Sequence, residues 1–104
     1  MIYCVDIDNT ICITYNSDYI NSIPIIERIN YINNLYDKGN RIIYFSARGS
    51  VSKKNLYDFT LKQLKDWKCK FHELILGKPN YDIMIDDKSE NSERFFKAVL
   101  WKKY

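Results

Sequence analysis

Short apolar runs recur along the chain, and each is bounded by polar or turn-forming residues. Runs of this length are typical of strands buried in a parallel sheet. Four of them predict strands, at residues 2–6, 41–46, 72–76 and 82–86. The first and the last of these runs end in an aspartate, which places acidic groups at two predicted strand ends.

Three longer stretches carry apolar residues at helical spacing. The first begins at Pro24, since proline favours a first helical turn, and ends at Gly39, a residue type that often follows a helix. Its apolar side comprises Ile25, Ile29, Ile32 and Tyr36. Two further helices are predicted at about residues 52–67 and 91–101. Their inward residues are predicted to be Leu56, Phe59, Leu64 and Trp67 in one, and Phe95, Phe96, Val99 and Leu100 in the other.

Strands that alternate with helices indicate right-handed βαβ crossovers and a mainly parallel sheet between helical layers. A chain of 104 residues fits one domain, and its two prolines and three glycines leave no room for a long linker. We therefore predict a single three-layer α/β domain of Rossmann-like form, spanning residues 1–104. In such sheets, ligands bind at the carboxyl ends of the strands.

Two pairs of aspartates stand at predicted strand ends. Asp6 and Asp8 follow the first strand, and Asp86 and Asp87 end the fourth. Four carboxylates at one sheet edge would raise one another's pKa values unless a cation lay between them, and Mg²⁺ suits carboxylate, carbonyl and water ligands. The sequence therefore predicts a Mg²⁺ site with Asp6 and Asp86 as direct ligands. The Asp8 backbone carbonyl would add another, and Asp87 would act directly or through water.

The same edge carries the groups that phosphoryl transfer requires. A carboxylate at such a site can act as a nucleophile, and we predict that Asp6 forms an aspartyl-phosphate. Asp8 would protonate the leaving group and later deprotonate the attacking water. The Ser46 hydroxyl would donate to a phosphoryl oxygen, and Lys78 would neutralise charge on the phosphoryl group. Arg48 is either a substrate contact or part of a structural salt bridge.

Each of these residues also has an ordinary structural explanation. Aspartates commonly cap helices and begin turns, which would account for Asp8 or for the pair 86–87. Ser46 alone would be a turn hydroxyl, and Lys78 alone a solvated surface charge. What favours phosphoryl transfer is the order in which all of them follow the strands.

These motifs resemble those of the haloacid dehalogenase-like (HAD) phosphohydrolase superfamily. Residues 6–10 (Asp-Ile-Asp-Asn-Thr) look like its first motif, DxDx[TV], and Ser46 looks like the second. Lys78 looks like the third motif, and the pair 86–87 looks like the acidic fourth. All four occur in the family's order and cover about residues 2–100. The resemblance implies a Rossmann-like sheet, an aspartyl-phosphate mechanism, Mg²⁺ as cofactor, and a flap after the first strand.

The chain leaves no room for the cap domain that many members of this superfamily carry. Residues 9–23 suffice only for a short flap, in which Thr10 matches the position that supports the flap and the active-site turn. The chain therefore resembles the minimal, capless class, and residues 46–49 and 77–79 resemble those of small phosphatases associated with surface-polysaccharide or sugar-phosphate pathways. The implied substrate is a small phosphate ester, such as a sugar phosphate. Tyr15, Tyr19 and Lys53 could line the entrance, although core or surface positions explain them more simply.

Charge and cysteine content indicate the cellular compartment and the kinds of partner that this protein has. The net charge of +3 is a mild excess that a solvated surface explains, although lysines concentrate at positions 53, 54, 62, 65, 68 and 70. Three cysteines without a CxxC pair favour a reducing compartment. The chain opens directly on a predicted strand instead of a signal peptide, and no apolar run approaches the roughly 20 residues that span a bilayer. We therefore expect a cytoplasmic protein with no membrane partner.

Other functions remain open. A 3′-phosphatase that acts on nucleic-acid ends would also use an open site, but the sequence shows no basic stripe interleaved with aromatic residues. A metal-dependent nuclease would not need Ser46 and Lys78 in this order. A receiver-like or phosphate-binding module, the non-enzyme alternative, usually carries its acceptor aspartate after the third strand, where residues 74–76 end without one. The nine tyrosines are compatible with a homo-oligomer but do not show one.

Overall fold

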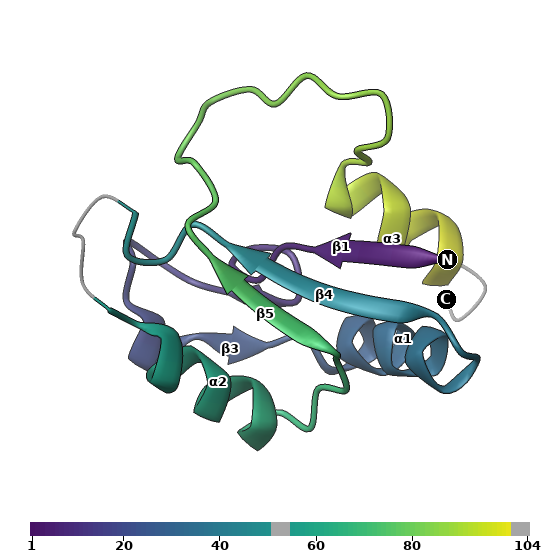
Figure 1. Ribbon diagram of the computed structural model, residues 1–104, viewed down its shortest axis with the longest axis horizontal. Coiled ribbons are helices and arrows are strands. Elements are labelled where there is room, and N and C mark those ends of the chain that lie inside the picture. Colours follow the sequence, from purple (N-terminus) through teal and green to yellow (C-terminus); the bar gives the residue numbers. More distant parts are fainter. Residues whose placement is uncertain (51–54, 101–104) are drawn as a thin grey trace.

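The computed structural model describes residues 1–50 and 55–100, and strands alternate with helices along them as predicted (Figure 1). In chain order the elements are β1 (Ile2–Val5), β2 (Cys12–Ile13), the 3₁₀ helix η1 (Tyr19–Asn21), β3 (Ile23–Pro24), α1 (Ile26–Asp37), β4 (Arg41–Ser46), α2 (Tyr57–Asp66), β5 (Glu73–Leu76) and α3 (Ser92–Leu100). The predicted start of the second helix at residue 52 and the predicted end of the third at residue 101 lie outside the described residues.

Three of the four predicted strands form a parallel sheet in the order β1-β4-β5. The register places Val5 beside Tyr44 and Tyr44 beside Leu74, and these three side chains are buried on one face. On the opposite face, the outer strands expose Cys4 and Glu73. The α/β architecture with a parallel sheet is therefore confirmed. A full helical layer on each face is not established, because the second face stays partly open.

The fourth predicted strand, at residues 82–86, is not a strand in the structure, so this prediction was wrong. These residues belong to the long loop between β5 and α3, which arches away from the sheet in Figure 1. Ile83 is 79% exposed and Ile85 is 95% exposed. An apolar run becomes a strand only where a neighbouring strand satisfies its backbone groups. Within the described part of the chain, no strand pairs with the outer edge of β1.

Helical spacing predicts twelve inward apolar positions, of which five are buried and seven are partly exposed. The buried apolar positions are Ile29, Ile32 and Leu35 of α1, Leu64 of α2, and Phe96 and Leu100 of α3, and Leu35 was not among those predicted. They join the buried sheet residues in one core. The Tyr31 ring meets the edges of Phe95 and Phe96 at centroid distances of 5.9 and 6.5 Å, which fixes α1 beside α3. No helix in the described ranges has the length and apolar character needed to cross a membrane.

The segment between β1 and α1 contains a short hairpin, which we call the flap. Strands β2 and β3 pair in an antiparallel hairpin, with Cys12 opposite Pro24 and Ile13 opposite Ile23, and η1 lies in the loop between them. Because Pro24 is part of this hairpin, α1 begins at Ile26 and not at the proline. The hairpin lies directly after the residues that carry the first motif, so it borders the candidate site.

The predicted glycine terminates α1, whose last residue is Asp37. Gly39 has a φ of +95°, a conformation that strains other residues. Its N–H donates to the Tyr36 carbonyl, and the Asn40 N–H donates to the Leu35 carbonyl. These two bonds make a Schellman motif, which turns the chain directly into β4.

Candidate active site

A tight turn after β1 separates the first two aspartates. Asn9 adopts a φ of +58°, which asparagine tolerates better than most residues, and the next two N–H groups donate to the Ile7 carbonyl at 3.1 and 3.0 Å. The Asn9 side chain accepts a hydrogen bond from the Thr14 N–H at 3.2 Å. Through this turn, Asp6 and Asp8 acquire different partners at the same edge of the sheet.

Asp6 lies beside Lys78. The Lys78 Nζ is 3.5 Å from the Asp6 Oδ2, and the Asp6 side chain is 37% exposed, so a ligand can reach it from solvent. Burial raises the pKa of the Asp6 carboxyl, and the Lys78 ammonium partly opposes that rise. Burial acts to lower the pKa of Lys78, but Asp6 and Tyr81 outweigh it and raise that pKa. The pair is therefore a carboxylate and an ammonium that stabilise each other's charge.

Backbone contacts between two loops place Lys78. Gly77 turns the chain after β5 with a φ of +98°. The Lys78 N–H then donates to the Ser46 carbonyl at 3.1 Å, and the Lys78 carbonyl accepts from the Ser50 hydroxyl at 2.8 Å. The loop after β4 and the loop after β5 are thus joined directly beside Asp6.

Asp8 is held by Arg48. The Arg48 Nε donates to Oδ2 and its Nη2 donates to Oδ1, both at 2.9 Å, and the Thr14 hydroxyl donates to Oδ1 at 2.7 Å. The Arg48 side chain is fully buried. Of the two roles left open for Arg48 by the sequence, the structure shows the ion pair.

Ser46 is the last residue of β4 and is fully buried. Its Oγ accepts a hydrogen bond from the Arg48 N–H at 3.1 Å, which stabilises the turn that follows the strand. In this arrangement Ser46 is a turn hydroxyl. Ser46 has no exposed surface, so no ligand reaches its hydroxyl in this arrangement. The contact of Ser46 with a phosphoryl oxygen therefore stays a prediction.

Asp86 and Asp87 are exposed in the loop between β5 and α3, and the structure does not bring them to Asp6 and Asp8. Across residues 1–50 and 55–100, no group of three or more His, Cys, Asp or Glu side chains gathers to hold a metal ion. Mg²⁺ demands a nearly octahedral shell of oxygen ligands, and of the predicted carboxylate ligands Asp6, Asp86 and Asp87, only Asp6 lies at the sheet edge. The donor groups in this arrangement therefore do not fit the predicted Mg²⁺ site.

Sequence reasoning missed the polar residues around Arg48. Thr60 and Gln63 of α2 accept hydrogen bonds from its Nη1 at 3.3 and 2.7 Å, and the Tyr19 ring centroid is 4.6 Å from its Cζ. Thr60 carries a recognisable signal, because it shares the inward side of the helix with Leu64 and a buried hydroxyl needs a partner. Gln63 carries no such signal in the sequence. Of the other two residues considered for the entrance, Tyr15 is exposed on the flap, and Lys53 lies outside the described residues.

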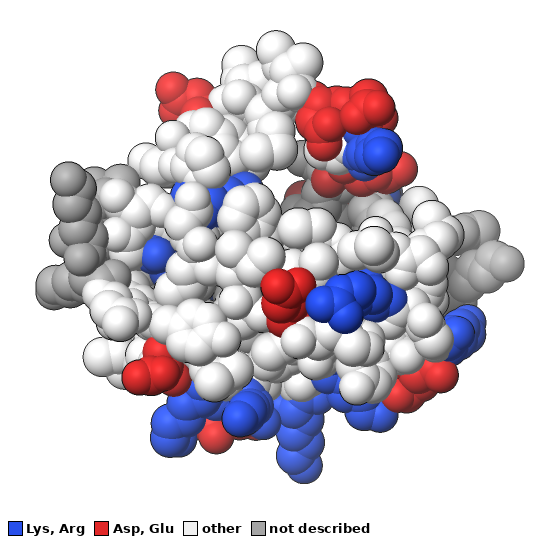
Figure 2. All heavy atoms as spheres, in the orientation of Figure 1, with Lys and Arg blue, Asp and Glu red and all other residues white. Residues whose placement is uncertain are grey.

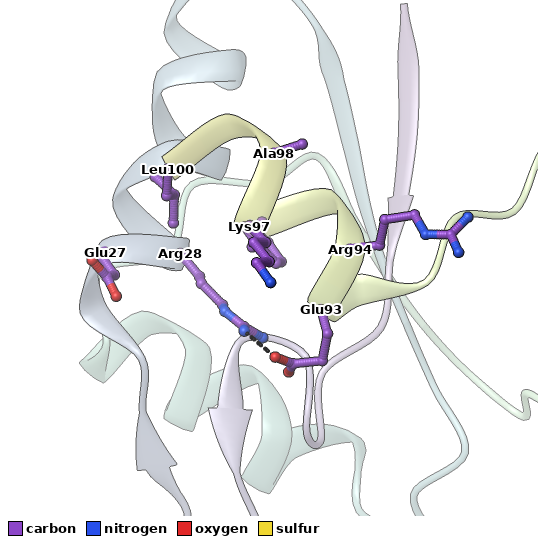
Figure 3. Close-up of a pocket in the computed structure, with 8 residues that line it drawn as sticks. Glu27, Arg28, Glu93, Arg94, Lys97, Ala98 and Leu100 are labelled. Carbon is purple, nitrogen blue, oxygen red and sulfur yellow. Dashed lines mark hydrogen bonds and ion pairs between the residues drawn. The ribbon is translucent and has the colours of Figure 1, made fainter. Parts of the chain in front are cut away.

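Two hollows of different character lie on the surface. One, of about 420 Å³, adjoins the loops after β4 and β5 and is lined by residues 48–50 and 55–57 with Leu76 and Gly77. The other, of about 930 Å³, lies between α1 and α3, where Arg28 pairs with Glu93 at 3.0 Å (Figure 3). Only the first adjoins the edge that carries Lys78, so it is the one that offers room for part of a ligand.

Basic side chains gather along the lower edge of the molecule in Figure 2, with acidic side chains among them. On the surface, Lys62 pairs with Asp66 at 3.0 Å, and Lys70 pairs with Asp37 at 2.8 Å. The sheet strands point to the left in the same view (Figure 1), so this basic edge is distinct from the one that carries Asp6. Lys62 and Lys70 are therefore paired with carboxylates, whereas Lys53 and Lys54 lie outside the described residues.

Comparisons with known proteins add one finding. No protein-family model matches the chain, and no curated protein matches it. Among solved structures, the crystal structure of an MCSG target from Vibrio cholerae superposes with a TM-score of 0.77. It is 22% identical in sequence, and the match covers 97% of this chain and 91% of that one. At this level of identity the likeness shows that the two chains share a fold.

Proposed function

We propose that this protein is a phosphatase that hydrolyses phosphate monoesters with Asp6 as the nucleophile. The observation that carries the proposal is the Asp6 carboxylate at the carboxyl end of β1, partly exposed and 3.5 Å from the Lys78 ammonium. A carboxylate that is open on one side and has a cation on the other suits attack on a negatively charged phosphoryl group. The resemblance of residues 6–10 to the first HAD motif supports the same role.

The proposed reaction has two steps that involve this chain's own residues. An Asp6 oxygen bonds to phosphorus, and the ester P–O bond breaks with its electron pair on the leaving oxygen, which takes up a proton. Water then attacks phosphorus and gives up a proton, and the bond to Asp6 breaks to release inorganic phosphate. Lys78 offsets charge in both steps. We propose that Asp8 handles both protons: its carboxylic acid form gives a proton to the leaving oxygen, and the carboxylate so formed accepts a proton from the attacking water.

Mg²⁺ is part of the proposal only if the loop that carries Asp86 and Asp87 can move toward Asp6. A site that combines Asp6 with Asp86 or Asp87 requires the loop at residues 81–91 to change position, because it leaves both aspartates exposed. The roles proposed for Asp6, Asp8 and Lys78 do not depend on the ion. Its involvement is therefore a separate question for experiment.

A small phosphorylated metabolite, such as a sugar phosphate, is the proposed substrate class. The hollow of about 420 Å³ is lined by Gly77, next to Lys78, and offers room for part of a small ligand. The basic edge of the molecule is partly neutralised by ion pairs, which favours a small substrate over a nucleic-acid end. Cys4, Cys12 and Cys69 are free thiols, and this supports a reducing compartment such as the cytoplasm.

Hydrolysis of p-nitrophenyl phosphate by the wild type and by Asp6→Asn, each with Mg²⁺ and with EDTA, tests the proposal. We expect turnover by the wild type, and a loss of about 10⁴-fold or more in Asp6→Asn with an unchanged circular dichroism spectrum. Loss of wild-type turnover in EDTA would show that a divalent cation is required. Asp66→Asn, an exposed aspartate on α2, is the matched control and should keep wild-type activity. Retained turnover in folded Asp6→Asn would contradict the proposal. Wild-type turnover that persists in EDTA would remove Mg²⁺ from it.

A further inference from the structure

Arg48 is a buried cation whose partners come from separate parts of the chain. Its Nε and Nη2 donate to the Asp8 carboxylate, and its Nη1 donates to Thr60 and to Gln63. A buried guanidinium is costly unless its N–H groups are satisfied. These contacts use four of the five N–H groups of arginine, and the Tyr19 ring packs against the guanidinium. The side chain is therefore built into the protein and is not presented to a ligand.

The same partners hold the flap. The Gln63 Nε2 donates to the Tyr19 carbonyl at 2.7 Å. The Thr14 hydroxyl, which donates to Asp8, also lies 2.6 Å from the Ser22 hydroxyl. Asp8 is thus tied to Arg48 on one side and to the flap on the other. A displacement of the guanidinium would release both the carboxylate and the flap.

We propose that Arg48 is a positioning residue for the hydrolysis, which acts by fixing Asp8 and does not bind the substrate. This inference rests on the proposed function. The planar guanidinium fork fixes both the location and the plane of a carboxylate, which a lysine ammonium cannot do. A displacement of about 1 Å can cost about 100-fold in rate. The geometry of the Arg48–Asp8 pair therefore sets the efficiency of proton transfer at Asp8.

Steady-state kinetics of Arg48→Lys and Arg48→Ala on an aryl phosphate test the proposal, with Arg41→Ala as the matched control. Arg41 is an arginine in an exposed ion pair with Glu73 at 3.2 Å, so its removal should leave activity at the wild-type level. We expect Arg48→Lys to lower kcat roughly 100-fold with KM within about two-fold of the wild type. Guanidinium ion, added below denaturing concentrations, should restore part of the kcat of Arg48→Ala and leave the control unchanged.

A double variant tests whether Arg48 acts through Asp8. In an Asp8→Asn background, Arg48→Lys should cause little further loss, because the carboxylate that Arg48 positions is already absent. A full additional 100-fold loss would show that Arg48 acts by another route. A raised KM at unchanged kcat in Arg48→Lys would make it a substrate contact. Either result would overturn the proposal.

A second variant and a second measurement keep the test decisive if Arg48→Ala does not fold. Thr60→Val removes one acceptor of the guanidinium at nearly constant volume, and it should lower kcat by less than Arg48→Lys does. Hydrogen exchange of the flap amides at residues 12–24 needs no turnover, and it should be faster in Arg48→Lys than in the wild type or in Arg41→Ala. If the wild type lacks turnover, the proposed function fails, and flap exchange then tests the one part of the inference that is independent of it, the role of Arg48 in holding the flap. Unchanged exchange in Arg48→Lys would overturn that role.

Discussion

The two aspartate pairs of this chain follow similar apolar runs, yet their surroundings differ. The run before Asp6 pairs with β4 along its whole length, and the pair that follows it gains Lys78 and Arg48 as partners. The run at residues 82–86 pairs with no strand in the described part of the chain, and the second acid pair is exposed. An apolar run that ends in acids therefore specifies a site only where a neighbouring strand holds it in place.

The isoleucines beside the two acid pairs show the same contrast in burial. Ile7, between Asp6 and Asp8, is completely buried in the core, whereas Ile85, next to Asp86, is 95% exposed. Burial of an isoleucine side chain contributes about 1.5–3 kcal/mol to folding. The first acid pair is thus coupled to the stability of the core, and the second is not.

Alanine substitution of these two isoleucines should give the largest difference between the regions. Ile7→Ala should lower the free energy of unfolding by about 4 kcal/mol, because it leaves a cavity in the core. Ile85→Ala should stay within about 0.5 kcal/mol of the wild type. Urea denaturation measures both values. A loss of about 2 kcal/mol or more for Ile85→Ala would show that residues 82–86 are buried in solution.

Asparagine substitution of the acids should give a smaller but parallel difference. Asp8→Asn should lower the free energy of unfolding by about 3 kcal/mol, since it leaves the buried Arg48 guanidinium without its counter-charge. Asp86→Asn should change it by less than about 0.5 kcal/mol. The same urea titrations, run at low ionic strength and without divalent cations, measure both. Equal losses for the two variants would mean that Asp86 also has a buried partner.

Much of the fold could be predicted because its signals are local. Apolar runs identified β1, β4 and β5, and helical spacing identified α1, α2 and α3. Gly39 marked the end of α1 because only a residue that tolerates positive φ fits there. Residues 82–86 were misassigned because a short apolar run indicates a strand without specifying a partner, and pairing is a property of the whole sheet.

The candidate site was predictable only in part, for a related reason. Asp6 and Lys78 meet because they follow β1 and β5, two parallel strands whose carboxyl ends lie at the same edge of the sheet on either side of β4. The pairing of Asp8 with Arg48 depends on side-chain directions in two turns, which sequence spacing does not encode. Gln63 was not found because its contact with Arg48 follows from how α2 packs against the flap.

Direct detection of a phosphoryl group on Asp6 tests the central claim most directly. The wild type is mixed with excess aryl phosphate, quenched in acid during steady-state turnover, digested, and analysed by mass spectrometry. We predict one added phosphoryl group on the peptide that contains Asp6, located on that side chain and absent from Asp6→Asn. Turnover without any phosphorylated peptide, or with the phosphoryl group on Asp8 instead, would contradict the assignment of Asp6 as the nucleophile.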